Sequence, residues 1–461
     1  MKNLKLHEWA LFAIALLARL PFLSAGYGRE EDAWAQALNA RLIWDSGQYE
    51  VSRLPGHPIY ELLLAALYSI EHSPLFFNLL SAIVSALSIV VFYKIAQRFL
   101  IPSPFLLSLG FGFIPSFFIA GTYTIDYNFG LLFLLLAFWQ MLNEKYLLAG
   151  IFVGIATGFR ISHLGFLLPL VILTYTRQHR FDEIIKMGIA ATVISIVAYL
   201  PAFFTYGFGF LDFHKPPFPG WASVLYKASI GVWGAFLLLF IVGSTAYLIA
   251  KLKHLRHTAI TKLPRNYWLA LLLLLAMQLF VFLRLPFKAE FFLVFIPFFV
   301  LYLASFYSSK WVLAFSLVSI FSCFFVGFDY QNSSRAGAAS PASINFNSNG
   351  KTIFMDALQG PVILDHTKRV AKSKLVYNFN QWSQQQKGKA WVIAGWYYPE
   401  IEMTQEYGNQ VKLDYYSSQA ELENAHRAGY SIYYLPEINQ ANAKINAHYL
   451  ADSIAKPWTS Q

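Results

Sequence analysis

The hydrophobic positions of this chain fall into long, nearly uncharged runs. A membrane span needs about 20 apolar residues, and shorter segments are tolerated when a helix bundle shelters them. On this basis we predict eleven spans within the first 330 residues. The predicted spans are residues 8–25, 76–97, 103–123, 127–143, 145–160, 162–176, 184–205, 229–250, 267–284, 289–307 and 311–328.

A further apolar segment, residues 59–70, affects the topology of everything that follows it. It holds about a dozen residues, which is short for a span, and Glu61 lies inside it. We therefore predict a helix at the membrane interface. Under the resulting topology, fourteen Lys and Arg residues lie on the side of the amino terminus and eight lie on the opposite side, up to residue 330. Because cytoplasmic loops are enriched in these residues, we expect the amino terminus inside and the tail outside.

The predicted outer loop, residues 26–75, carries a helical pattern of its own. Apolar residues recur at four-residue spacing and predict one apolar face on a helix that begins near Asp32: Trp34, Leu38 and Leu42. A turn rich in Pro and Gly at residues 54–58 separates this helix from the apolar segment after it. We therefore predict two juxtamembrane helices joined by an elbow, in a loop structured enough to position chemical groups.

Beyond Gly327 the composition changes. Residues 331–350 are small and polar, as is typical of a linker, and residues 351–461 are typical of a soluble domain. Four short apolar runs predict strands: Val362–Leu364, Trp391–Trp396, Val411–Tyr416 and Ile432–Leu435. Two helices are expected between them, one with Leu375, Phe379 and Trp382 on a shared face and one over Ala420–Ala428 that ends at Gly429. The tail is thus predicted to be a small α/β domain on the outer side.

Composition agrees with a membrane protein. Hydrophobic residues make up 57% and charged residues 13% of the 461 positions, against about 45–50% and about 25% in soluble domains. The net charge of +10 forms no basic stripe outside the short loops, so we expect no nucleic-acid partner. Cys323 is the only cysteine, which excludes a disulfide or a thiolate metal cluster within one chain. The expected fold class is an all-α polytopic membrane protein with a small C-terminal α/β domain.

The acidic run Glu30-Glu31-Asp32 directly follows the first predicted span. Such a run is often a solvated face, or, with Asp32 before a helix, an N-cap and a partner for the helix dipole. Its place at the membrane surface, beside a partly apolar loop, favours a second role. Partly desolvated carboxylates can serve there as a base or as ligands of a cation.

The order of motifs in the first 330 residues resembles that of the GT-C glycosyltransferases, in the style of bacterial aminoarabinose transferases and protein O-mannosyltransferases. The first outer loop carries the resemblance, with Arg-Glu-Glu-Asp-Ala-Trp at residues 29–34, Gly-Gln-Tyr at 47–49 and Leu-Pro-Gly-His-Pro at 54–58. Further matches lie at residues 124–127, 154–162 and 286–293. The resemblance implies an integral protein of the bacterial cell membrane that uses a sugar linked to a polyprenyl phosphate.

The resemblance also implies roles for individual residues. In that family an acidic pair supplies the catalytic carboxylate, and the matching pair here is Glu31-Asp32, with Glu first where Asp is more usual. Either residue is therefore a candidate base, and Glu30 is a third if the register slips. Whether a divalent cation is bound stays open, and Glu31 and Asp32 are the expected ligands if one is.

A leaving polyprenyl phosphate is anionic, so its site needs fixed cations near the outer ends of spans. Three residues meet this condition on the side of the acidic run: Arg160, Arg284 and Lys288. The alternative for each is a side chain that extends from the bilayer to water, or, for Lys288, a pair with Glu290. Three further substrate-binding candidates are Glu290, Asp126 and His57. Each has a structural alternative, since Glu290 can pair with Lys288, Asp126 is placed to cap the fourth span and His57 to bond to backbone at the elbow.

Three classes of function remain at this stage. The first is an inverting glycosyltransferase that moves a sugar from a polyprenyl-phosphate donor to a lipid, glycan or protein acceptor on the non-cytoplasmic face. The second is a transporter or flippase of a lipid-linked sugar, which predicts paired spans broken by Gly or Pro in corresponding halves and charges near the membrane midplane. Neither feature is evident in the sequence. The third is a membrane scaffold, which leaves the outer acids and bases without a role.

Overall fold

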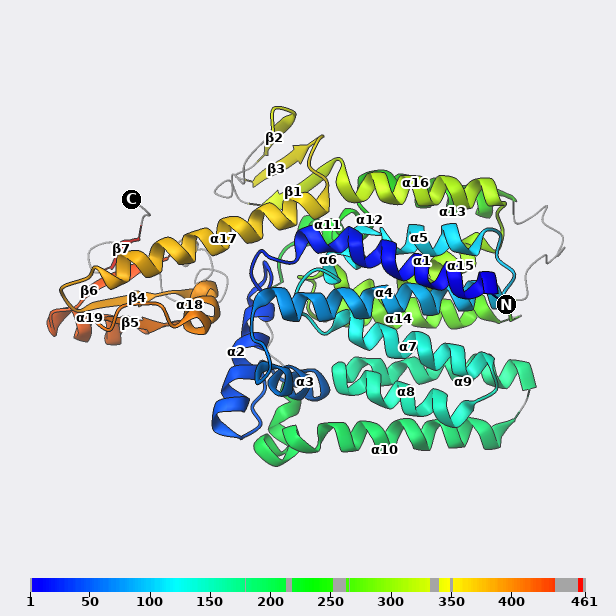
Figure 1. Cartoon of the computed structure of the whole chain (residues 1–461), viewed down its shortest axis with the longest axis horizontal. Helices are drawn as coiled ribbons and strands as arrows, with labels where there is room; N and C mark the ends of the chain where they lie inside the picture. The colour runs from blue at the N-terminus through cyan, green and yellow to red at the C-terminus, as the bar shows by residue number, and fades with distance from the viewer. Residues whose placement is uncertain are drawn as a thin grey trace.

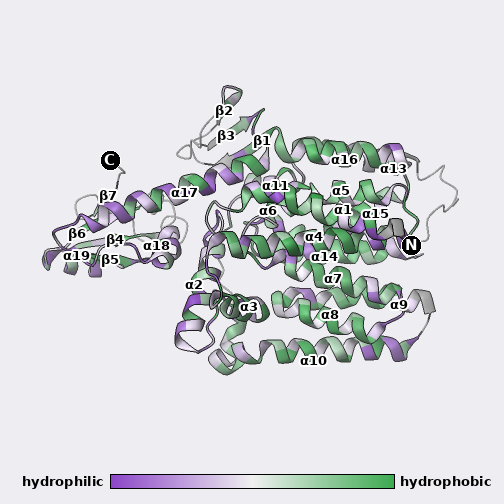
Figure 2. Cartoon of the chain, in the orientation of Figure 1, coloured by the Kyte–Doolittle hydropathy of each residue, from purple (hydrophilic) through white to green (hydrophobic). Residues whose placement is uncertain are grey.

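The computed structural model of the protein describes residues 2–178, 180–212, 218–251, 263–264, 266–331, 340–348, 351–435 and 455–458. Figure 1 shows a bundle of helices that run side by side, with a smaller α/β part projecting from one end. The amino terminus lies at the other end of the bundle. Apolar residues cover the bundle helices, whereas the α/β part is more hydrophilic (Figure 2).

The bundle contains the helices that the apolar runs predict. They are α1 (Lys2–Arg19), α4 (Pro74–Arg98), α5 (Pro104–Gly112), α6 (Pro115–Ala120), α7 (Tyr127–Leu142), α8 (Tyr146–Phe159), α9 (Leu167–Gln178), α10 (Phe181–Tyr206), α11 (Trp221–Ala228), α12 (Ile230–Trp233), α13 (Ala235–Lys251), α14 (Tyr267–Arg284), α15 (Phe295–Ala304) and α16 (Ser309–Phe324). Short 3-10 segments join some of them: η1 (Leu20–Phe22), η2 (Ile161–Phe166), η3 (Gly207–Leu211) and η4 (Ala289–Phe292).

The structure bears out the predicted membrane bundle only in part, because many of its helices are short. Among the described residues, three helices are long and apolar enough to cross a membrane: Pro74–Arg98, Phe181–Leu211 and Tyr267–Arg284. A fourth span results if Trp221–Trp233 and Ala235–Ala250, which meet at 90°, form one broken span. The number of eleven spans is therefore not confirmed.

Proline explains one of the breaks. The predicted span over residues 103–123 is two helices, α5 and α6, and Pro115 occupies the first turn of the second. Proline has no N–H to donate and disfavours the helical conformation of the residue before it, here Ile114, whose ψ is 125°. An apolar run alone cannot reveal such a break, because both halves are equally hydrophobic.

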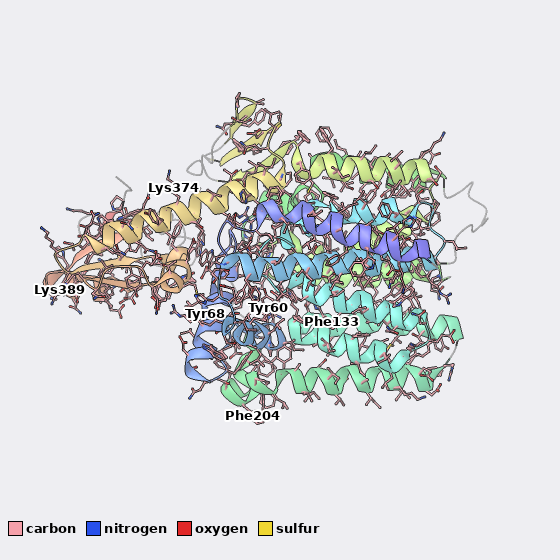
Figure 3. All side chains as sticks on the ribbon, in the orientation of Figure 1. Tyr60, Tyr68, Phe133, Phe204, Lys374 and Lys389 are labelled. Carbon is pink, nitrogen blue, oxygen red and sulfur yellow. The ribbon has the colours of Figure 1, made fainter. Side chains whose placement is uncertain are left out.

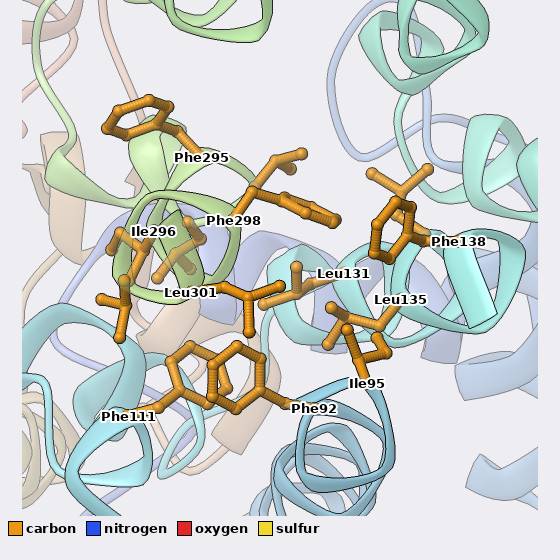
Figure 4. Packing of buried hydrophobic residues seen from close by; sticks show 14 of the residues in the cluster. Phe92, Ile95, Phe111, Leu131, Leu135, Phe138, Phe295, Ile296, Phe298 and Leu301 are labelled. Carbon is orange, nitrogen blue, oxygen red and sulfur yellow. The ribbon is translucent and has the colours of Figure 1, made fainter. Parts of the chain in front are cut away.

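The interior of the bundle is filled by aromatic and aliphatic side chains from several helices. Figure 4 shows Phe92 of α4, Phe111 of α5 and Leu301 of α15 packed together, with Phe138 of α7 nearby. In Figure 3 the apolar residue Phe133 lies within the bundle, and the charged residue Lys389 lies on the α/β part.

The outer loop forms the two expected helices, α2 (Glu31–Ser46) and α3 (Pro58–Tyr68). Both lie across the end of the bundle that is nearer the α/β part (Figure 1). They pack on each other through a second apolar cluster that includes Trp34, Ile43 and Tyr60. Of the predicted apolar face of α2, Trp34 and Leu38 are buried and Leu42 is 39% exposed. These two helices hold one end of the bundle in a fixed arrangement.

After α16 the chain forms a small antiparallel sheet with strand order β1-β3-β2. Its strands are β1 (Gly327–Gln331), β2 (Ser343–Ser348) and β3 (Lys351–Asp356). Strand β2 lies within the range for which a linker is predicted. The polar sequence of this range does not indicate a strand, because β2 is held by backbone pairing with β3 along its whole length.

Helix α17 (Pro361–Gln384) leads from this sheet to the rest of the α/β part. Its first turn includes Val362–Leu364, so the strand predicted there is wrong. Val362 is 1% exposed and packs with Phe113, Phe118 and Cys323 of the bundle. Burial against the bundle explains why these residues are apolar, and Pro361 suits the first position of a helix.

A second, parallel sheet has strand order β5-β4-β6-β7. Its strands are β4 (Ala390–Ile393), β5 (Val411–Asp414), β6 (Ser431–Tyr434) and β7 (Ala455–Pro457), and the elements beside them are η5 (Gly395–Tyr397), α18 (Tyr398–Thr404) and α19 (Gln419–Arg427). Three of the four predicted strands are thereby confirmed. Helix α19 also ends as expected, with Gly429 at a φ of +84°.

Candidate functional site

The acidic run lies at the start of α2, at the end of the bundle that faces the α/β part. Glu30 is the residue before the helix, and Glu31 and Asp32 are in its first turn. Their side chains point to different partners. Glu30 and Asp32 meet cations of the bundle, whereas Glu31 meets the α/β part.

Asp32 lies between two cations from different segments. Its Oδ2 contacts Lys288, in the segment just before η4, and Arg53, in the loop between α2 and α3. The Lys288 ammonium also lies 2.7 Å from Oε2 of Glu30. The structure thus brings Lys288 and the acidic run together, as the sequence predicts. It adds Arg53, which the sequence analysis missed although it stands directly before the Leu-Pro-Gly-His-Pro elbow.

The charges in this group affect one another strongly. Burial opposes ionisation of Glu30, but Lys288 and Arg29 outweigh it and lower the pKa of Glu30 to about 2. Glu290 lies in η4 and accepts a hydrogen bond from the Tyr123 hydroxyl at 3.3 Å.

A second cluster surrounds Asp126, which is fully buried. Its carboxylate accepts hydrogen bonds from the Arg160 guanidinium, with Nη2 at 3.2 Å from Oδ1, and from Nε2 of Gln36 at 3.1 Å. The Arg160 guanidinium also lies 3.7 Å from the centre of the Tyr127 ring. Within the part of the chain that the structure describes, the Asp126 side chain caps no backbone N–H of α7. The capping role considered for Asp126 is therefore wrong.

His57 and Arg53 connect the two clusters. Nδ1 of His57 is 2.7 Å from the carbonyl oxygen of Phe159 and 3.7 Å from Oδ2 of Asp126. Nε of Arg53 donates to Nε2 of His57 at 3.3 Å, while its guanidinium also contacts Asp32. The backbone contact expected for His57 is confirmed. Among the described residues, no group of three or more His, Cys, Asp or Glu side chains is arranged to hold a metal ion.

The remaining predicted cation, Arg284, is the last residue of α14. Its side chain is exposed. A phosphate-binding role for Arg284 stays a prediction.

Glu31 faces the α/β part. The hydroxyl of Tyr415, which follows β5, donates a hydrogen bond to Oε2 of Glu31 at 3.1 Å. Burial raises the pKa of Glu31, although this hydrogen bond and the charge of Lys372 on α17 act in the opposite direction. The sequence of the α/β part predicts no chemistry for it. The contact joins residues 384 positions apart, and no local motif marks it.

Comparison with known proteins gives the fold a reference. No model of a protein family matches the sequence, and no curated protein matches it. Two crystal structures of ArnT from Cupriavidus metallidurans are similar to this chain, and in both comparisons 94% of each chain is covered. The apo form has a TM-score of 0.55 at 10% identity, and the form bound to undecaprenyl phosphate has a TM-score of 0.51 at 11% identity.

At this identity the likeness concerns the fold. ArnT is an aminoarabinose transferase of the GT-C superfamily. The similarity spans both the helical bundle and the α/β part, since it covers nearly the whole chain. The chain therefore shares its overall fold with ArnT, a GT-C glycosyltransferase, over nearly its whole length.

Proposed function

We propose that this protein is a membrane glycosyltransferase that takes a sugar from a polyprenyl-phosphate donor, such as one linked to undecaprenyl phosphate, and transfers it to an acceptor outside the cytoplasm. The observation that carries the proposal is the meeting of two acidic side chains, Glu30 and Asp32, with Lys288 and Arg53 at one end of the bundle. The GT-C fold supports it, because ArnT, which has this fold, binds undecaprenyl phosphate.

The proposed reaction is an inverting displacement at the anomeric carbon of the sugar. A carboxylate accepts the proton of the acceptor hydroxyl while the oxygen of that hydroxyl forms a bond to the anomeric carbon. The bond from the carbon to the phosphate oxygen breaks, and polyprenyl phosphate leaves with one additional negative charge. Fixed cations that face this charge lower the barrier, because they need little rearrangement during the reaction.

The contacts suggest a division of roles between the two carboxylates. Asp32 holds Lys288 and Arg53 at the place where the phosphate is proposed to bind. Glu31 is the proposed base, since its carboxylate contacts Tyr415 of the α/β part and burial raises its pKa. A base is most effective when its pKa lies near the working pH. Glu31→Gln is then expected to lower the rate of transfer by about 10²–10⁴-fold while membrane abundance stays normal.

The first prediction tests the two cations. Losing one charge-assisted contact to phosphate costs about 1.5–3 kcal/mol, or roughly ten- to a hundredfold in rate or donor affinity. We expect Lys288→Ala and Arg53→Ala each to show a loss of this size. The measurement is transfer by purified protein, with polyprenyl-phosphate sugars as donors and mass spectrometry of the acceptor. Lys310→Ala, at an exposed position of α16, is the matched control and should behave like wild type.

A structural role for the two cations would give another result. Folded yield or melting temperature would then fall while turnover per folded molecule stayed normal. Unchanged donor binding and turnover in both variants would remove these cations from the proposed site.

A transporter of lipid-linked sugars is the second candidate, because one observation favours it. The described residues contain a span broken at 90° between α12 and α13, and broken spans are typical of transporters. Proteoliposomes with donor on one side distinguish the two functions. A transporter moves the intact lipid-linked sugar across the bilayer, whereas a transferase consumes it only when an acceptor is present.

A further inference from the structure

Tyr415 of the α/β part reaches the acidic run through its hydroxyl group. Tyr415 donates to Glu31 at 3.1 Å, and the side chain of Trp396 hydrogen-bonds to Tyr415 in turn. Since the indole N–H is only a donor, Trp396 donates to the Tyr415 oxygen. The Tyr415 hydroxyl therefore has its own proton directed at the carboxylate. Both aromatic residues follow strands of the parallel sheet, at the edge that faces α2.

Additional contacts hold the α/β part against α2. The Arg41 side chain, 7% exposed, donates through Nη1 to the carbonyl oxygen of Glu402 at 2.8 Å. Its Nη2 lies 3.6 Å from Oε1 of the same residue. Met403 packs against the apolar cluster of α2 and α3. Helix α18 is thus attached to α2 by a buried cation and by apolar contact.

Helix α17 contributes to the same interface. Nζ of Lys372 is 3.2 Å from Oε2 of Glu400, which is 1% exposed. The same ammonium lies 5.9 Å from the centre of the Trp34 ring and 5.6 Å from that of Tyr397. One cation therefore contacts aromatic rings of α2 and of the α/β part. Several independent contacts fix the position from which Tyr415 approaches Glu31.

We propose that the C-terminal α/β domain completes the catalytic site, with Tyr415 as a positioning residue that holds the Glu31 carboxylate toward the acceptor. This inference rests on the proposed function, in which Glu31 is the base. A carboxylate in the first turn of a helix has several rotamers, and the hydrogen bond from Tyr415 selects one of them. Docking of the domain would then set the rate of transfer without adding a group that touches the donor.

The principal test is a double-mutant cycle with purified full-length protein. Tyr415→Phe removes one oxygen atom and keeps the ring, so the interface stays packed. We expect kcat to fall roughly three- to tenfold with little change in the KM for the donor, since one hydrogen bond to a charged group is lost at a partly exposed position. In the Glu31→Gln background, Tyr415→Phe should cause no additional loss, because the carboxylate through which it acts is gone.

Two further variants keep the test decisive. Tyr416→Phe, at the exposed neighbouring position, is the matched control and should leave kcat unchanged. Arg41→Ala weakens docking of α18, so it should lower kcat by a similar factor, and its combination with Tyr415→Phe should be less than additive. This second cycle gives an answer even if Glu31→Gln is too slow to measure.

The outcomes separate this inference from the function on which it rests. Absence of transfer by the wild-type protein with all donors supplied would count against the proposed function. Transfer by wild type with an unchanged kcat for Tyr415→Phe would overturn the inference alone. An equal loss from Tyr415→Phe in the wild-type and Glu31→Gln backgrounds would also overturn it, because the tyrosine would then act independently of Glu31.

Discussion

At the scale of single residues, the partners of a side chain decide its role more than its place in a helix does. Asp126 stands where a helix cap is expected, yet its carboxylate faces Arg160, Gln36 and His57. These partners come from the junction of α8 and η2, from α2 and from the elbow loop. The side chains of both Asp126 and Arg160 are almost completely removed from solvent. Such a pair is costly to break, since each charge depends on the other.

The second prediction concerns this pair. Asp126→Asn leaves the Arg160 guanidinium buried without a counter-charge, and removing one partner of a buried ion pair costs about 3–5 kcal/mol. We expect a clear fall in melting temperature in detergent. The double variant Asp126→Asn, Arg160→Gln should recover part of it, because no unpaired charge remains. Asp212→Asn, at an exposed position, is the control.

The same variants decide whether Arg160 has the phosphate-binding role expected from the sequence. If Arg160 serves only to pair with Asp126, the double variant regains activity along with stability. If Arg160 also binds phosphate, stability returns but donor affinity stays low. A melting temperature for Asp126→Asn equal to that of wild type would refute the pairing argument itself.

At the scale of elements, a buried carboxylate organises the loop between α2 and α3. Glu61 of α3 is fully buried and accepts hydrogen bonds from the Tyr49 hydroxyl at 2.6 Å, from the backbone and hydroxyl of Ser52 at 2.8 and 2.7 Å, and from the backbone of His57 at 3.0 Å. Burial raises the pKa of Glu61, and these hydrogen bonds lower it. Arg53 lies within this loop, so the hydrogen bonds of Glu61 determine the position of the Arg53 side chain.

The third prediction follows from this arrangement. Glu61→Gln replaces one accepting oxygen by an NH2 group, which cannot accept from the donors on that side. We expect faster hydrogen exchange at the backbone of residues 47–57 and a loss of donor binding comparable to that of Arg53→Ala. The two changes combined should be less than additive. Glu50→Gln, whose side chain is exposed, is the control. A rate of hydrogen exchange at residues 47–57 of Glu61→Gln equal to that of wild type would contradict this prediction.

Elements also show how far the sequence can predict this fold. Periodicity identifies α2, α3 and α19, because one face of each meets an apolar surface. It fails at Val362–Leu364, where an apolar triplet suits a strand and the first turn of a helix equally well. Length alone also misses breaks within an apolar run, such as the one at Pro115 between α5 and α6. A short apolar segment has a definite conformation only in relation to its neighbours, and these are not visible in sequence.

The candidate site is likewise only partly predictable from the sequence. The acidic run, Lys288 and Asp126 attract attention because they are charges at the ends of apolar runs. Tyr415 belongs to a different part of the chain and carries no charge, so sequence gives no reason to place it beside Glu31. The contact depends on how the α/β part docks on α2, which is a property of the whole molecule.

At the scale of the whole molecule, the charge distribution and the shape bear on the same question of topology. The predicted topology puts the amino terminus inside and the tail outside, on the basis of the distribution of Lys and Arg. In Figure 1 the amino terminus and the α/β part lie at opposite ends of the bundle, as this topology requires. The proposed site lies at the end of the bundle that faces the α/β part. The orientation of the protein in the membrane therefore decides from which side the acceptor must arrive.

The last prediction tests this orientation by labelling single cysteines in intact cells. Cys323 is fully buried, so wild-type protein should give little background with a membrane-impermeant maleimide. Lys389→Cys, just before β4 in the α/β domain, should be labelled in intact cells. Lys310→Cys, in the first turn of α16 near the other end of the bundle, should be labelled only after the membrane is opened. Both positions are exposed, so a difference between them reflects the membrane rather than burial. Labelling of both in intact cells would contradict the predicted topology, and labelling of Lys310→Cys alone would place the proposed site on the cytoplasmic face.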